Sequence, residues 1–120
     1  MATFRDLLAA AKAEIREVDT KQTQARIDAG GVILLDVREP EEFVGELGHI
    51  RGALLVPLDL LQLRLPKLAG YVDREIVAVC RAGARSATAG ATLRRAGFSR
   101  VAHLAGGMIA WADAGLSVER

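Results

Sequence analysis

The chain has 120 residues, of which 51% are apolar, and a formal net charge of +1. This length suits one domain with a core of its own. Acidic and basic residues are interspersed, which argues against nucleic-acid binding, and no segment has the ~20 consecutive apolar residues of a membrane span. A single cysteine cannot form an internal disulfide, which is typical of a reducing compartment. We therefore expect a cytoplasmic protein with neither a nucleic-acid nor a membrane partner.

The first predicted element is an accessory N-terminal helix within residues 1–17. Thr3 to Asp6 has the pattern of a capped helix start, and apolar residues then recur at helical spacing as far as Val18. This spacing indicates one apolar face, which packs against either the core or a partner. We place the main domain at residues 18–118.

Helices and strands alternate along the rest of the chain. Four short apolar runs predict strands covered on both faces, at residues 32–35, 53–56, 76–79 and 101–104. Helices are predicted at residues 20–29, 40–43, 58–65, 85–96 and 108–114. Pro66 is expected to end the third of these helices. The alternation predicts an α/β fold, with a parallel sheet of four to five strands and helices on both faces.

The only cysteine, Cys80, stands at the carboxyl end of a predicted strand, which is where open α/β sheets bind ligands. The loop and helix start that follow it are Arg81, Ala82, Gly83, Ala84, Arg85 and Ser86. Free backbone N–H groups at a helix start, together with two arginines, form a cradle that binds anions and favours a thiolate. Such a thiolate can attack phosphorus or sulfur; the alternative is an inert buried cysteine.

The size of the loop bears on the choice between phosphorus and sulfur. Protein tyrosine phosphatases use a Cys-x5-Arg loop, whose arginine grips the phosphate. Here only four residues separate Cys80 from Arg85. A smaller ring fits one sulfur atom better than a tetrahedral phosphoryl group. Arg85 then either contacts the substrate anion or bonds loop carbonyls or the Asp36 carboxylate, and the short ring favours the second role.

Four segments in order resemble the single-domain rhodaneses, a family of sulfurtransferases, over roughly residues 18–118. They are LLDVREPEEF at 34–43, GHIRGALLVPL at 48–58, CRAGARSATAGATLRRAGF at 80–98 and LAGGMIAWADAGLSV at 104–118. The resemblance implies a small rhodanese-like α/β domain with a parallel sheet. It also implies transfer of a sulfane sulfur through a cysteine persulfide, without a cofactor.

The resemblance assigns roles to individual residues. It implies that Cys80 is the persulfide-forming nucleophile, that residues 81–85 complete the active loop, and that Ser86 opens the supporting helix. Asp36 and Arg38 match the DVR segment of the family and are expected to support the loop through ion pairs or hydrogen bonds. We expect thiosulfate or a related small anion as the sulfur donor, and cyanide, a thiol or a protein cysteine as the acceptor.

Three other interpretations stay open: a sulfur carrier for one protein partner, a binding module without catalysis, and a phosphatase or arsenate reductase. The two histidines, His49 and His103, do not have the spacing of metal ligands, so we expect no metal site. We expect Trp111 in the core and Glu42 on a solvated helix face. The sequence leaves the oligomeric state open.

Overall fold

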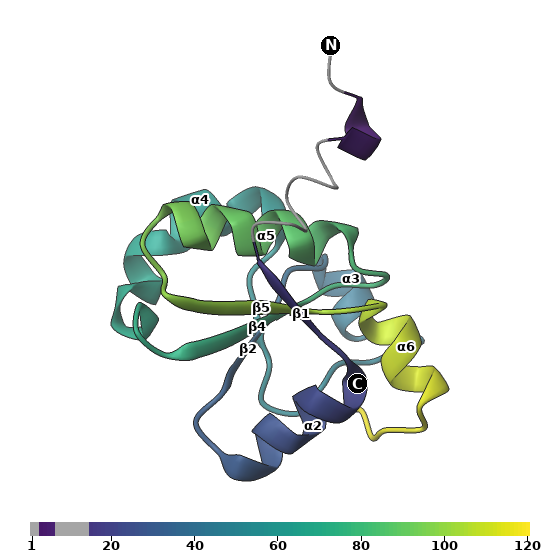
Figure 1. Ribbon diagram of the computed structural model, residues 1–120. Coiled ribbons are helices and arrows are strands. Elements are labelled where there is room, and N and C mark those ends of the chain that lie inside the picture. Colours follow the sequence, from purple (N-terminus) through teal and green to yellow (C-terminus); the bar gives the residue numbers. More distant parts are fainter. Residues whose placement is uncertain (1–2, 7–14) are drawn as a thin grey trace.

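The computed structural model describes residues 3–6 and 15–120. Its centre is a parallel sheet of five strands in the order β1-β5-β4-β2-β3 (Figure 1). The strands are β1 (Arg16–Val18), β2 (Ile33–Asp36), β3 (Leu54–Leu55), β4 (Glu75–Val79) and β5 (Arg100–Leu104). The predicted α/β fold with a parallel sheet is therefore confirmed. The sequence indicated four of these strands directly, and β1 is the fifth.

Helices cover both faces of the sheet, with α4 and α5 on one side and α2 and α6 on the other (Figure 1). The helical elements are α2 (Thr20–Ala29), α3 (Pro40–Phe43), α4 (Leu58–Leu68), the 3-10 turn η1 (Ala69–Tyr71), α5 (Ala84–Arg95) and α6 (Gly107–Asp113). None of the helices in the described part of the chain is both long and apolar enough to cross a bilayer.

Each face of the sheet has its own apolar core. Under α4 and α5 the buried side chains include Leu35, Leu61, Ile76, Leu93 and Val101. On the opposite face, Leu34, Val77, Leu104, Met108 and Trp111 pack together. Successive strand residues point to opposite faces, so strands that are buried on both sides are apolar throughout. Trp111 is 1% exposed, which confirms its predicted place in the core.

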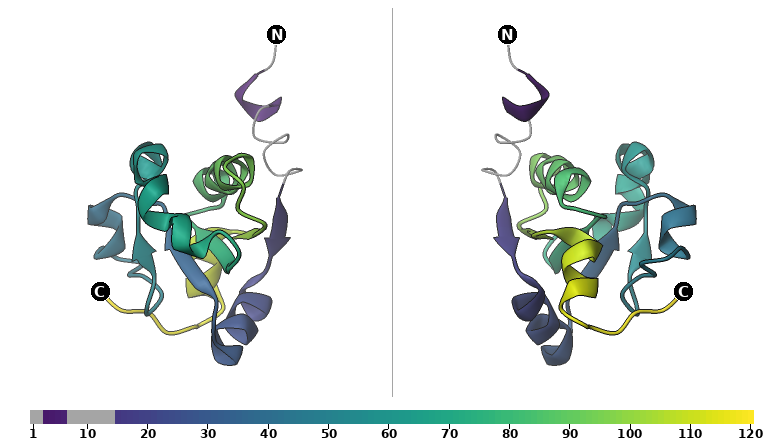
Figure 2. Two further views of the ribbon diagram at one scale, coloured as in Figure 1. Left: turned by 90° about the vertical axis from the view of Figure 1, so that its left-hand side faces the viewer. Right: turned by 90° about the vertical axis from the view of Figure 1, so that its right-hand side faces the viewer.

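The predicted N-terminal helix extends too far. Phe4 to Asp6 is helical and residues 7–14 lie outside the described part of the chain, but Arg16–Val18 is strand β1. This strand pairs with β5 at one edge of the sheet (Figure 2). Ile15 and Val18 are buried there, and Ile15 packs so closely on α5 that a Cβ at Gly90 would overlap its side chain. Tertiary packing therefore makes this segment a strand, although its apolar residues have helical spacing.

Pro66 does not end α4, contrary to the prediction. The helix continues to Leu68 and contains Pro66 in its last turn. A proline there removes only one backbone donor, the N–H that would bond the Gln62 carbonyl. Leu61 and Leu68 are both buried on the core side of the helix. Burial of leucine side chains, worth ~1.5–3 kcal/mol each, outweighs one lost hydrogen bond.

Candidate active site

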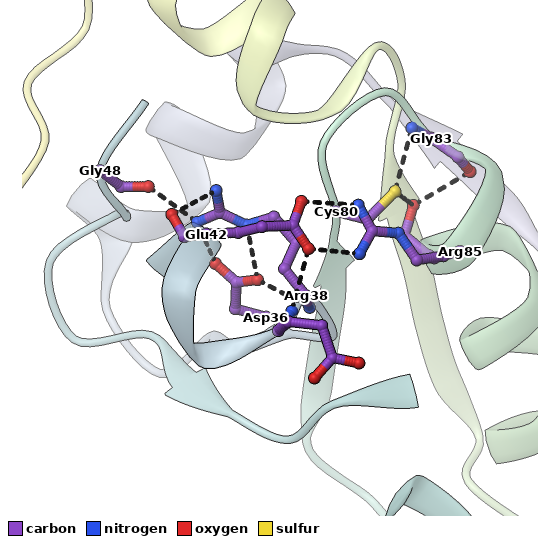
Figure 3. A network of polar contacts seen from close by, with 9 residues as sticks. Asp36, Arg38, Glu42, Gly48, Cys80, Gly83 and Arg85 are labelled. Carbon is purple, nitrogen blue, oxygen red and sulfur yellow. Dashed lines mark hydrogen bonds and ion pairs between the residues drawn. The ribbon is translucent and has the colours of Figure 1, made fainter. Parts of the chain in front are cut away.

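Two strands bring the candidate site together at the carboxyl edge of the sheet. Asp36 is the last residue of β2 and lies opposite Val79, the last residue of β4. Cys80 follows directly, so the cysteine and the acidic residue come from neighbouring strands. Open α/β sheets place their ligands at this edge. The topology therefore puts Cys80 and the Asp36–Arg38 segment side by side (Figure 3).

The Cys80 thiol lies at the base of its loop and is buried, with 1% of the residue exposed. The Gly83 N–H donates to Sγ at 3.0 Å (Figure 3). The Ser86 hydroxyl lies 3.5 Å from Sγ. Gly83 is the capping residue directly before α5 and has a φ of +116°, which side-chain-bearing residues rarely adopt. This conformation turns a backbone donor toward the sulfur, as an anion at that position requires.

Helix α6 holds the active loop from behind. The backbone N–H groups of Met108 and Ile109 donate to the carbonyls of Cys80 and Arg81, at 2.8 and 3.0 Å. Gly107 approaches so closely that a Cβ there would overlap the Cys80 carbonyl oxygen. From the sequence alone, Gly106 and Gly107 predict only a turn. The signal was two adjacent glycines between a buried strand and a helix, a pattern typical of close backbone approach.

Arg85 forms a two-pronged ion pair with Glu42 of α3, with N–O distances of 2.6 and 2.8 Å (Figure 3). The Arg85 hydrogen bond lowers the pKa of Glu42 to about 2, and the same bond raises the pKa of Arg85. The expectation that Glu42 lies on a solvated helix face is wrong, because its side chain is 28% exposed and its carboxylate is engaged. The predicted partners of Arg85 were the loop carbonyls or the Asp36 carboxylate, and the prediction is wrong, because its guanidinium bonds Glu42 instead.

Asp36 and Arg38 form a buried ion pair beneath this contact. Arg38 bonds Asp36 through Nε and a terminal nitrogen at 2.9 and 2.8 Å, and both side chains are 1% exposed. The guanidinium also donates to the carbonyls of Glu42 and Gly48, at 3.2 and 2.7 Å. Removing one partner of such a pair typically costs ~3–5 kcal/mol. Asp36 therefore fixes Arg38, Arg38 fixes α3, and α3 presents Glu42 to the active loop.

The remaining predicted site residues differ in their exposure to solvent. Arg81 and Ala82 are exposed at the mouth of the loop, Ala84 is half-buried at the start of α5, and Ser86 is buried. His49 stacks on Phe43 with ring centroids 3.7 Å apart. The loop thus has a buried thiol and donor set below, and an exposed arginine above. This arrangement can hold a small anion against a nucleophilic sulfur.

The fold and the site together define a parallel α/β domain with a buried cysteine in a loop at the carboxyl edge of the sheet. The family model described as rhodanese-like domain matches residues 19–114. The chain belongs to the rhodanese-like domain family. It is 39% identical over 105 residues to a sulfurtransferase of Allochromatium vinosum, a match that covers 87% of this chain and 94% of that protein.

Larger proteins contain similar domains. The chain is 37% identical to part of the probable adenylyltransferase/sulfurtransferase MoeZ of Mycobacterium tuberculosis, where the match covers 87% of this chain and 26% of MoeZ. Among solved structures, a Rhodopseudomonas palustris protein of unknown function, described as a possible tyrosine phosphatase, has a TM-score of 0.87, with 29% identity over 99% of this chain and 96% of its own. Thiosulfate sulfurtransferase from Pseudomonas aeruginosa has a TM-score of 0.80, with 29% identity over 92% of this chain and 21% of its own.

Proposed function

We propose that this protein is a sulfurtransferase that carries a sulfane sulfur as a persulfide on Cys80. The observation that carries the proposal is the buried Cys80 thiol with the Gly83 N–H directed at it. The names of several relatives support the same reaction class. A persulfide has a negative outer sulfur, which the Gly83 N–H and the positive charge of Arg81 at the mouth of the loop stabilise.

The reaction runs in two steps. The Cys80 thiolate attacks the outer sulfur of a donor such as thiosulfate, a new S–S bond forms, and the donor's S–S bond breaks. Its electron pair leaves with sulfite, and the negative charge stays on the outer sulfur of the Cys80 persulfide. An acceptor nucleophile, which is cyanide or a thiolate, then takes that sulfur and releases the Cys80 thiolate. Ping-pong kinetics follow from the covalent intermediate.

The arginines of the loop affect how the anionic sulfur donor binds. Arg85 is paired with Glu42, so within residues 80–86 the exposed Arg81 is the arginine available to a dianion. We expect Arg81→Ala to raise the KM for thiosulfate and to change kcat little, since its charge acts on bound donor and transition state alike. An unchanged KM would show that Arg81 points away from the donor.

The alternative function is phosphatase activity, because the similar Rhodopseudomonas palustris protein is described as a possible tyrosine phosphatase. A phosphatase would need Arg85 to grip phosphate, whereas two of its nitrogens bond Glu42. The test compares thiocyanate formation from thiosulfate and cyanide with hydrolysis of p-nitrophenyl phosphate, using wild type and Cys80→Ser. We expect only the first activity, and expect Cys80→Ser to abolish it. Phosphate release without thiocyanate would overturn the proposal.

A dedicated sulfur carrier would share the first step but differ in the second. Its persulfide would form with thiosulfate, yet cyanide and small thiols would remove the sulfur slowly compared with one protein cysteine. The mass of the protein after thiosulfate treatment reports the first step, and thiocyanate formation reports the complete cycle. We expect cyanide and small thiols to turn the enzyme over, because the mouth of the loop, at Arg81 and Ala82, is exposed.

A further inference from the structure

A buried polar chain leads away from Cys80 on the side opposite the loop mouth. The Ser86 hydroxyl lies 3.5 Å from Cys80 Sγ and 3.1 Å from His103 Nδ1. His103 Nε2 lies 3.7 Å from a carboxylate oxygen of Glu17. Ser86 and His103 are buried, whereas the Glu17 side chain is 47% exposed. This chain of polar side chains therefore runs from the Cys80 thiol, past α5 and β5, to the surface at β1.

The position of the imidazole follows from the sheet. In the register of the strands, His103 on β5 lies beside Ala78 on β4 and beside Glu17 on β1. Helix α5 packs on the same face and presents Ser86. The Glu17 carboxylate lies at the His103 end of these residues, and the Arg85 guanidinium acts electrostatically on Cys80 at the other end. A buried polar side chain costs free energy unless it is bonded, so a histidine here indicates a specific use for its nitrogens.

We propose that His103 accepts the Cys80 proton through the Ser86 hydroxyl, which makes Ser86 and His103 positioning residues for the thiolate. The thiol proton passes to Ser86 Oγ while the hydroxyl proton of Ser86 passes to His103 Nδ1. The products are a thiolate and an imidazolium, and no electrons are exchanged. The carboxylate of Glu17 faces Nε2 and stabilises the positive ring.

The same chain acts when the sulfur leaves. Once Nδ1 carries a proton, it donates to Ser86 Oγ, and the hydroxyl proton of Ser86 turns to Sγ. The Gly83 carbonyl, 3.2 Å from Ser86 Oγ, is the competing acceptor. A thiolate carries a full negative charge and a carbonyl does not, so the sulfur attracts the proton more strongly. The Cys80 thiolate released from the persulfide is thereby met by two donors, Gly83 N–H and Ser86 O–H.

The test is alkylation of Cys80 by iodoacetamide as a function of pH, in wild type, Ser86→Ala, His103→Asn and the double variant. Asparagine keeps a polar side chain in the strand but cannot take up a proton. We expect each single variant to slow alkylation at neutral pH by roughly tenfold, the scale of one hydrogen bond to a charged atom, and to shift the rate profile to higher pH. The double variant is expected to be no slower than either single variant, since residues that act as a unit are not additive.

Val101→Ala is the matched control, because it opens a cavity on the same strand and face without touching the polar chain. It is expected to lower the melting temperature and leave the alkylation profile unchanged. Two results would overturn the relay: a His103→Asn profile that superimposes on wild type, or a double variant whose slowing is the product of the two single effects. The relay rests on the proposed function, but alkylation measures only the reactivity of the Cys80 thiol. The relay can therefore fail while sulfur transfer is observed, and sulfur transfer can fail while the relay is observed.

Discussion

Glu42 is the residue that most changes the electrostatics of the site. It bonds both terminal nitrogens of Arg85, and its Oε1 also accepts the backbone N–H of Glu39 at the start of α3. One carboxylate therefore caps a helix and holds the arginine that closes the active loop. Its negative charge also offsets the charge that Arg85 would otherwise offer to a donor. The loop is held in shape at the expense of its attraction for anions.

Glu42→Gln separates these two effects. An amide cannot form two charge-assisted bonds to the guanidinium, so we expect a loss of stability of about 1–2 kcal/mol for this partly exposed pair. Arg85 would then be free to meet the donor, and the KM for thiosulfate is expected to fall several-fold while kcat falls with the looser loop. Thermal melting and steady-state kinetics measure both.

Glu41→Gln is the control for Glu42→Gln, since the neighbouring Glu41 is exposed on the same helix. It removes the same charge from α3 without touching Arg85 and should leave the melting temperature and the KM unchanged. If Glu41→Gln and Glu42→Gln behave alike, the ion pair with Arg85 has no part in shaping the loop.

Sequence reasoning located the cysteine loop but not all of its supports. A lone cysteine at a strand end, followed by glycine and arginine, is a local pattern that can be seen without a structure. The contact between Arg85 and Glu42 joins residues 43 positions apart, and Glu42 looks like any other acidic residue on a short helix. The buried place of His103 depends in the same way on the pairing of β1, β5 and α5.

At the scale of elements, α6 acts as a brace for the active loop. Its first N–H groups bond the loop carbonyls in place of partners within the helix. Gly107 allows this approach in two ways: it has no Cβ to meet the loop, and it adopts a φ of +57°. The loop can keep its donors directed at Cys80 only while its own carbonyls are held from behind.

Gly107→Ala is expected to cost at least ~2 kcal/mol of stability and most of the sulfurtransferase activity, because the new Cβ displaces the loop backbone. Gly115→Ala is a matched control: its φ is +72°, and a Cβ there meets nothing within 4 Å. It should show the backbone cost alone, about 1 kcal/mol, with full activity. Urea unfolding and turnover distinguish the two; equal losses of activity would refute the bracing role of α6.

Most of the helices and strands can be predicted from the sequence. Apolar runs predict β2, β4 and β5 to within a residue or two, and the predicted helix at residues 20–29 matches the bounds of α2. The failures came where packing overrides local preference. Residues 16–18 have helical spacing but complete a sheet edge, and α4 runs through Pro66 because Leu68 continues its buried face. Neither outcome can be read from a window of neighbouring residues.

At the scale of the whole molecule, the charge pairs link the sheet, α3 and the active loop. Asp36 and Arg38 lie in the interior, Glu42 and Arg85 at its margin, and α3 joins the two pairs. The fold thus couples the shape of the loop to ionisation. The pKa of Glu42 is lowered from 4.5 to about 2 by Arg85, so folding favours its charged form.

This coupling predicts a dependence of stability on acid. A carboxyl whose folded pKa lies below its unfolded value contributes its full stabilisation above about pH 4.5 and loses it as the pH falls toward about 2. Urea unfolding of wild type and Glu42→Gln should differ by about 1–2 kcal/mol near neutral pH, and the difference should shrink steadily below about pH 4.5. A difference that stays constant down to about pH 3 would show that Glu42 stabilises the fold by something other than its charge.

Intact mass spectrometry shows whether Cys80 carries the transferred sulfur. Wild type incubated with thiosulfate should gain the mass of one sulfur atom, and cyanide should then remove it. Cys80→Ser changes one atom in the wall of the site and should stay folded with no gain in mass. A wild type that gains no sulfur, or a serine variant that gains the same sulfur, would show that Cys80 does not carry the transferred sulfur.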